Sequence, residues 1–64
     1  MKAGELREKT RKELLALLEK KRKELLKRKM ELKVGKLRNV HLPSLIRKDI
    51  ARILTVLKEK ELVS

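Results

Sequence analysis

The sequence predicts an all-α fold, a long antiparallel two-helix hairpin with a short N-terminal helical turn. Ala, Glu, Lys, Leu and Arg make up 45 of the 64 residues, a composition that is typical of long helices. Helix-forming residues run without a break from Thr10 to Val34, and Gly35 follows them. Apolar residues then recur at helical spacing in a second segment, which the chain reaches after a short connection.

The first helix is expected over about residues 11–34. Its start has the residues of a capping box, because Thr10 can accept a hydrogen bond from the Glu13 amide while the Glu13 carboxylate reaches back. Gly35 offers a left-handed stop at the other end.

One side of this first helix is predicted to be apolar. At 100° per residue, the stripe comprises Leu14, Leu15, Leu17, Leu18, Leu25, Leu26 and Leu32, with Met30 at its margin. Ahead of the helix, residues 2–9 are expected to form a short helical turn, with Leu6 folded onto the hairpin.

The connection over residues 35–40 is short, which favours an antiparallel neighbour. Asn39 is a candidate N-cap for the second helix. Pro43 leaves two starts open, one near the proline itself and one with an irregular first turn from residue 40. We place this helix over about residues 41–62. The face expected to pack on the leucine stripe comprises Leu45, Ile46, Ile50, Ile53, Leu54, Val56 and Leu57.

The size of the chain allows one domain, residues 1–64, and a chain this short buries little of its surface. We therefore expect marginal stability alone and a firmer structure on a partner. The absence of Cys excludes disulfides and thiolate metal sites. No apolar run approaches the roughly 20 residues that cross a bilayer, and no signal peptide is apparent, so we expect a cytoplasmic protein.

Catalysis is not supported by any pattern in the chain. His41 is the only histidine, no carboxylate pair at a fixed spacing lies in a plausible cleft, and the two glycines are far apart. Asp49 lies beside the apolar stripe of the second helix, where pairing with a basic residue of the first helix is the favoured interpretation. We expect no enzyme, no cofactor, no metal site and no small-molecule substrate.

Positive charge is concentrated, and it carries most of the functional information. Of the net charge of +11, an excess of +8 lies between Lys20 and Arg38, a segment that contains ten basic residues and two glutamates. Like charges this dense on one helix repel, so an anionic partner should neutralise them. Nucleic acid and an anionic membrane surface are the two candidate partners.

The polar face of the second helix has a small centre between cations. Arg47 and Lys58 lie on one flank and Lys48 and Arg52 on the other, with Ala51 and Thr55 between them. A solvated helix face gives the same pattern, but the small centre favours close approach of a nucleic-acid backbone. The candidate RNA-binding residues are Lys27, Lys36, Arg38, Asn39, His41, Arg47, Lys48, Arg52, Thr55 and Lys58.

Several partners remain to be weighed. The absence of aromatic residues excludes readers that stack bases on Phe, Tyr or Trp, and it also removes the usual anchors of membrane-surface helices. A DNA-binding basic zipper needs a separate dimerisation seam, for which neither helix is long enough. A base-blind, rigid hairpin suits folded RNA. A basic module on anionic membranes, or a coiled-coil adaptor, is the alternative.

Three segments carry a resemblance to a known family: "MKAGELREKT", "GKLRNVHL" and "IRKDIARILTVLKEKE". They resemble the universal large-subunit ribosomal protein family numbered twenty-nine in bacteria, and the match covers essentially the whole chain. Residues 47–52 are the most specific part. Pro43 and Ser44 depart from the usual first turn of the second helix, and Met30 stands where Phe is frequent.

The resemblance implies a structural constituent of the large ribosomal subunit that binds large-subunit rRNA and supports translation. It implies a place near the peptide exit tunnel, beside ribosomal protein twenty-three, in the cytoplasm. Trigger factor and the signal recognition particle dock in that neighbourhood and are possible partners. Where the residues of this sequence match the family's pattern, the resemblance favours five of them as rRNA contacts: Asn39, Arg47, Lys48, Arg52 and Thr55.

Overall fold

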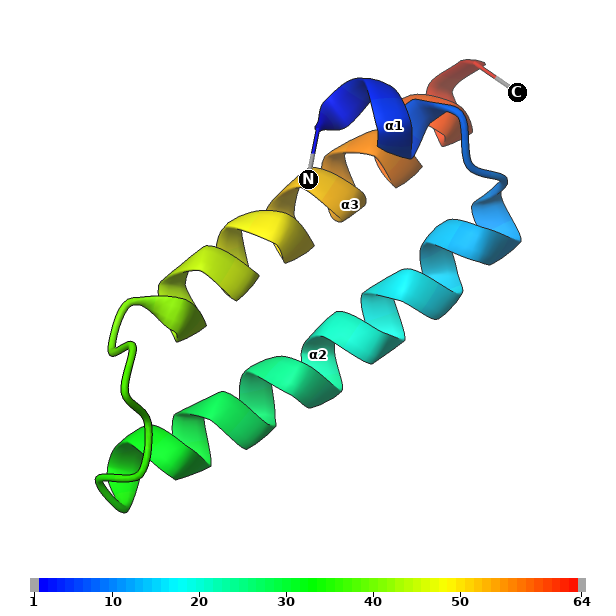
Figure 1. Cartoon of the computed structure of the whole chain (residues 1–64). Coiled ribbons are helices and arrows are strands. Elements are labelled where there is room, and N and C mark those ends of the chain that lie inside the picture. The colour runs from blue at the N-terminus through cyan, green and yellow to red at the C-terminus, as the bar shows by residue number, and fades with distance from the viewer. Residues whose placement is uncertain (1, 64) are drawn as a thin grey trace.

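The computed structural model describes residues 2–63, and of Val63 the backbone alone. All regular elements in this range are helices, namely α1 (Ala3–Arg7), α2 (Arg11–Lys33) and α3 (Leu42–Val63). Figure 1 shows α2 and α3 running antiparallel along the molecule, with α1 lying across the end of α3. The molecule is elongated, 44 × 17 × 15 Å along its principal axes. The predicted all-α hairpin with a short N-terminal helix is therefore confirmed.

The first turn of α2 is held by the predicted capping box. The Glu13 amide donates to Oγ1 of Thr10 at 3.2 Å, and the Thr10 amide donates to Oε1 of Glu13 at 3.2 Å. These hydrogen bonds satisfy two amides that a helix start otherwise leaves without partners. The hydrogen bond from the Thr10 amide also favours the ionised carboxylate and so lowers the pKa of Glu13.

Gly35 ends α2, as the sequence predicted. Its φ of +74° lies in the left-handed region, which costs a residue with a side chain more than it costs glycine. The Lys36 amide donates to the carbonyl of Glu31 at 2.8 Å, and the Gly35 amide donates to the carbonyl of Leu32 at 3.1 Å. This pair of hydrogen bonds is a Schellman motif, which closes the helix and turns the chain back.

Asn39, the candidate N-cap of the second helix, lies before the start of α3. The Asn39 side chain accepts from the His41 amide at 3.0 Å and thereby closes the turn before the helix. The first helical hydrogen bond runs from the Leu45 amide to the carbonyl of His41, at 3.1 Å. Pro43 is the second residue of α3, where its missing amide hydrogen has no helical acceptor to lose.

The apolar core lies at the end of the hairpin that α1 covers. Leu17 and Ile50, both partly buried, pack against it. Its buried members are Leu6, Leu14, Leu18, Ile53, Val56 and Leu57. The predicted docking of Leu6 onto the hairpin is confirmed by this cluster.

Several residues of the two predicted stripes are exposed instead. On α2, Leu26 and Met30 are each 62% exposed. The other exposed members of the predicted stripes are Leu15, Leu32, Leu45 and Leu54. The prediction was too broad because a two-helix hairpin has a single seam. Each helix buries a strip of residues against its one neighbour, and the margins of a wide stripe remain in solvent.

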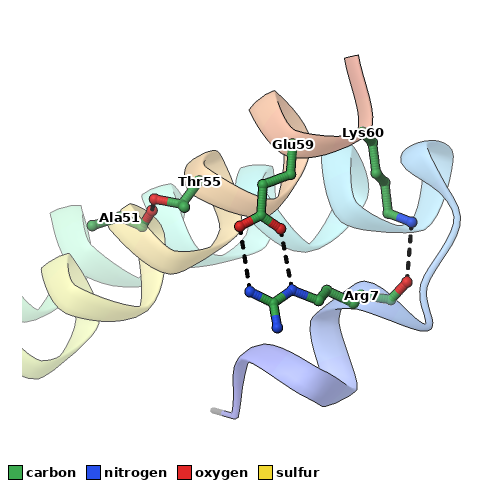
Figure 2. Close-up of polar contacts among 5 residues, drawn as sticks. All are labelled: Arg7, Ala51, Thr55, Glu59 and Lys60. Atoms are coloured by element: carbon green, nitrogen blue, oxygen red, sulfur yellow. Dashed lines mark hydrogen bonds and ion pairs between the residues drawn. The ribbon is translucent and has the colours of Figure 1, made fainter. Parts of the chain in front are cut away.

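α1 is fastened to the end of α3 by polar contacts as well as by Leu6. Arg7 donates from Nε to Oε2 of Glu59 at 3.1 Å and from Nη2 to Oε1 at 3.3 Å, as Figure 2 shows. Lys60 Nζ donates to the Arg7 carbonyl at 3.0 Å. At the start of α2, Arg11 pairs with Glu61 at 3.7 Å. The two chain ends are thus joined at one end of the hairpin.

Candidate nucleic-acid interface

Charge is divided unequally along the hairpin. Residues 20–53, which form the half that contains the turn, carry thirteen of the twenty basic residues and three of the nine acidic ones, a net charge of +10. The remaining residues carry seven basic and six acidic groups, a net charge of +1. We call these the turn half and the closed half. Almost all of the net charge therefore belongs to the turn half.

The three acidic side chains of the turn half lie along the seam between α2 and α3. Oδ2 of Asp49 lies 3.7 Å from Nζ of Lys21 across the seam, and both side chains are only 20% exposed. Lys21 also lies 3.7 Å from Glu24. The sequence-based prediction that Asp49 pairs with a basic residue of the first helix is confirmed.

The remaining acid, Glu31, is paired within α2. Nη1 of Arg28 donates to Oε1 of Glu31 at 2.8 Å, and both side chains are partly buried. Arg28 therefore lies at the seam, whereas from the sequence it was only one of the ten basic residues between Lys20 and Arg38. Because the seam takes up all three acids, the outward sides of both helices in the turn half are left with basic side chains.

The outward side of α3 is the first of two basic surfaces. We call it the α3 face, and it comprises Arg47, Lys48, Ala51, Arg52, Thr55 and Lys58, all of which are exposed. Nη1 of Arg52 also lies 3.7 Å from Oδ1 of Asp49, so the Arg52 guanidinium is partly neutralised by an acid of the seam. The structure thus brings together on one surface the six residues that the wheel placed there.

The hydroxyl of Thr55 is engaged within α3. It donates to the Ala51 carbonyl at 2.9 Å, one helical turn back (Figure 2). The hydroxyl hydrogen is therefore used inside the helix. What Thr55 and Ala51 supply is a low surface between the cations, and contact of Thr55 with RNA stays a prediction.

The turn supplies a second group of candidates. Lys36, Arg38, Asn39 and His41 are exposed and lie between α2 and α3. The side-chain oxygen of Asn39, Oδ1, accepts from the His41 amide, which leaves the side-chain NH2 group of Asn39 as the donor for a ligand. These residues continue the positive surface around the end of the hairpin.

The outward side of α2 is the second basic surface, and sequence reasoning assigned only Lys27 on it. Among the described residues, none of its six basic side chains has an ion pair, and all six are exposed. We call this surface the α2 face, and its basic residues are Lys20, Arg22, Lys23, Lys27, Lys29 and Lys33. The excess of positive charge between Lys20 and Arg38 indicated that such residues exist. Which of their side chains point outward depends on where the seam lies, and the sequence does not show that.

Other kinds of site find no support in residues 2–63. This range contains no group of three His, Cys, Asp or Glu side chains placed to hold a metal ion, and it forms no pocket. Within the same range, no helix has the length and apolar character to cross a membrane.

Comparisons with known proteins agree with the resemblance in the sequence. The family model described as Ribosomal L29 protein matches residues 4–60. The chain is 48% identical to the large ribosomal subunit protein uL29 of Thermotoga petrophila, over 97% of this chain and 94% of that protein. It is 47% identical to the protein of the same name from Thermosipho africanus, with the same coverage, and 48% identical to that of Coprothermobacter proteolyticus, over 94% of each chain. This chain therefore belongs to the ribosomal L29 protein family.

Proposed function

We propose that this chain is a structural constituent of the large ribosomal subunit in the cytoplasm, and that it binds the backbone of large-subunit rRNA through the α3 face and the turn. Membership of a ribosomal protein family supports the first part, and it identifies a structural component of the ribosome rather than an enzyme. The single observation that carries the second part is the net charge of +10 on the turn half, whose acids are paired along the seam.

The physical reason for backbone binding is counterion release. RNA holds a layer of condensed cations, and each basic side chain that neutralises a phosphate releases part of that layer. Exposed residues such as Arg47, Lys48 and Lys58 can do this without reading a base. The low surface at Ala51 and Thr55 lets the sugar-phosphate chain approach the helix between them.

The location in the subunit rests on the family resemblance. We place the hairpin near the peptide exit tunnel, beside ribosomal protein twenty-three, where trigger factor and the signal recognition particle dock. The elongated shape, 44 Å long, suits a protein that lies along an RNA surface. In this arrangement the turn half contacts rRNA together with the end of the α3 face, Thr55 and Lys58, and the rest of the closed half is available to other contacts.

Charge reversal on the α3 face tests RNA binding. We expect Arg47→Glu with Lys48→Glu to release the protein from large subunits at lower salt than the wild type, measured by co-sedimentation over a salt series. For two lost phosphate contacts, the slope of log affinity against log salt should fall by about 1.4 to 1.8.

A matched control is available in the closed half. Lys2→Glu with Lys12→Glu makes the same change in net charge at two exposed residues that have no ion pair among the described residues. This variant should release close to wild-type salt. Equal release of the two variants would show that only total charge matters and would contradict the assignment of the α3 face. Strong binding to anionic vesicles together with indifference to rRNA would favour a membrane-surface module instead.

A further inference from the structure

The two basic surfaces of the turn half point away from each other. Each helix turns its partly buried side toward the seam, where Lys21 of α2 meets Asp49 of α3. The α2 face and the α3 face are the opposite sides of those helices, so the whole seam lies between them. A single RNA strand on one face does not reach the other without passing around the hairpin, whose cross-section measures 17 × 15 Å.

The α2 face is long enough to bind a strand by itself. Its basic residues run from Lys20 to Lys33, about 20 Å at 1.5 Å per residue. On a helical wheel they form two rows, with the exposed side chains of Leu26 and Met30 between them. This repeats the plan of the α3 face, where cations flank a centre of short or uncharged side chains.

Acidic side chains are absent from this surface within residues 20–33. Glu24 and Glu31, the acids of that segment, are partly buried and paired with Lys21 and Arg28. Glu19 is exposed one residue earlier and marks the limit of the surface. Protein interfaces are depleted of lysine, whereas five of the six cations that flank Leu26 and Met30 on this surface are lysines. Two rows of like charge match the uniform charge of a phosphate backbone.

We propose that the hairpin binds two separate RNA segments at once, one on the α3 face and one on the α2 face, and so holds them apart at a distance set by its own width. This inference rests on the proposed function, because it assigns a second RNA segment to a protein already taken to bind one. The protein then acts as a spacer between two parts of the folded rRNA as well as a cover on its surface.

Stoichiometry tests the proposal directly. The full chain is mixed with an excess of one RNA stem-loop, and native mass spectrometry counts the stem-loops on each protein. We expect the wild type to form a complex of one protein with two stem-loops. Mass also separates this complex from a protein dimer that carries one stem-loop on each subunit.

Variants on each face assign the two sites. Lys23→Glu with Lys27→Glu on the α2 face, and Arg47→Glu with Lys48→Glu on the α3 face, should each bind one stem-loop. We expect the ratio of two-stem-loop to one-stem-loop complex to fall at least about tenfold in each, as the loss of two phosphate contacts implies. The Lys2→Glu, Lys12→Glu control should keep both stem-loops. Lysine and glutamate have similar helix propensities, and circular dichroism verifies that each variant remains helical.

The outcomes separate the two proposals. A wild-type protein that saturates at one stem-loop overturns the two-segment inference and leaves RNA binding intact. A second stem-loop that survives the α2-face substitutions also overturns it, and the α2 face then serves a partner other than RNA. A wild-type protein that binds no stem-loop overturns the proposed function itself and the inference that rests on it.

Discussion

The ion pair between Arg7 and Glu59 is the best-formed polar contact between distant parts of the chain. Two hydrogen bonds, at 3.1 and 3.3 Å, join the guanidinium to the carboxylate. They favour the charged form of both groups, so the hydrogen bond from Arg7 lowers the pKa of Glu59 and that from Glu59 raises the pKa of Arg7. This contact is exposed, so its contribution to stability is small and depends on pH.

We predict that Glu59→Gln lowers the melting temperature slightly at neutral pH and has less effect in acid. A carboxylate whose pKa is lowered by folding stabilises the protein fully above its ordinary value of 4.5, and this stabilisation is lost as the pH falls through the lowered folded-state value. Circular dichroism melts from neutral pH to about pH 3 measure the difference. Glu19→Gln, an exposed acid without an ion pair among the described residues, should show a smaller difference at neutral pH. A Glu59→Gln effect that grows in acid would contradict the assignment.

We predict that Gly35→Ala destabilises the free protein by about 1 to 2 kcal/mol, the cost of left-handed backbone for a residue with a Cβ. Apart from its two chain neighbours, nothing lies within 4 Å of the position that a Cβ would take, so the cost comes from the φ of +74° alone. Urea denaturation measures the change. Gly4→Ala is the matched control, because Gly4 also has open space but lies in α1, where alanine is the better helix former. Equal effects at the two glycines would contradict this account.

Much of the local structure could be predicted at this scale. The Thr10 capping box and the Gly35 stop depend on residues close in the sequence, and the pairing of Asp49 depends only on which helix faces it. Asn39 and Thr55 were harder, because a short polar side chain can bond to its own backbone or to a partner, and the choice depends on local geometry. The Asn39 oxygen bonds to the turn and the Thr55 hydroxyl bonds to its own helix.

At the scale of the helices, the seam decides which leucines stabilise the fold. Leu14 and Leu26 belong to the same predicted stripe, yet Leu14 is fully buried and Leu26 is 62% exposed. The period of the apolar pattern can be read from the sequence. Which part of the apolar stripe the partner helix buries depends on the direction in which that helix crosses. This is also why the six basic residues of the α2 face could not be assigned individually from the sequence.

We predict that Leu14→Ala costs about 2 to 5 kcal/mol of unfolding free energy, which is enough to unfold much of a small domain. Leu26→Ala should cost less than about 0.5 kcal/mol, as surface substitutions usually do. Urea denaturation followed by circular dichroism compares them. If Leu14→Ala leaves too little folded protein to measure, Ile53→Val, at another fully buried position, should cost about 0.5 to 1.5 kcal/mol. Similar costs for Leu14→Ala and Leu26→Ala would show that the seam lies elsewhere.

For the molecule as a whole, the two halves of the hairpin have different sources of stability. The closed half has most of the apolar core and the contacts of α1, while the seam of the turn half contains the ion pairs of Lys21 and Arg28. The repulsion among thirteen basic residues lies in that same half. A polyanion that neutralises them therefore stabilises the half of the molecule that has the less apolar seam.

The hairpin is proposed to bind rRNA through the turn half and the α3 face, which continues to Lys58, and not through the rest of the closed half. Lysine acetylation, read by mass spectrometry, tests this central claim most directly by comparing the free protein with the protein in the large subunit. We expect protection of Lys23, Lys27 and Lys48, with Lys2 and Lys12 remaining as reactive as in the free chain. Protection of Lys2 and Lys12, with the lysines of the turn half left reactive, would contradict the account.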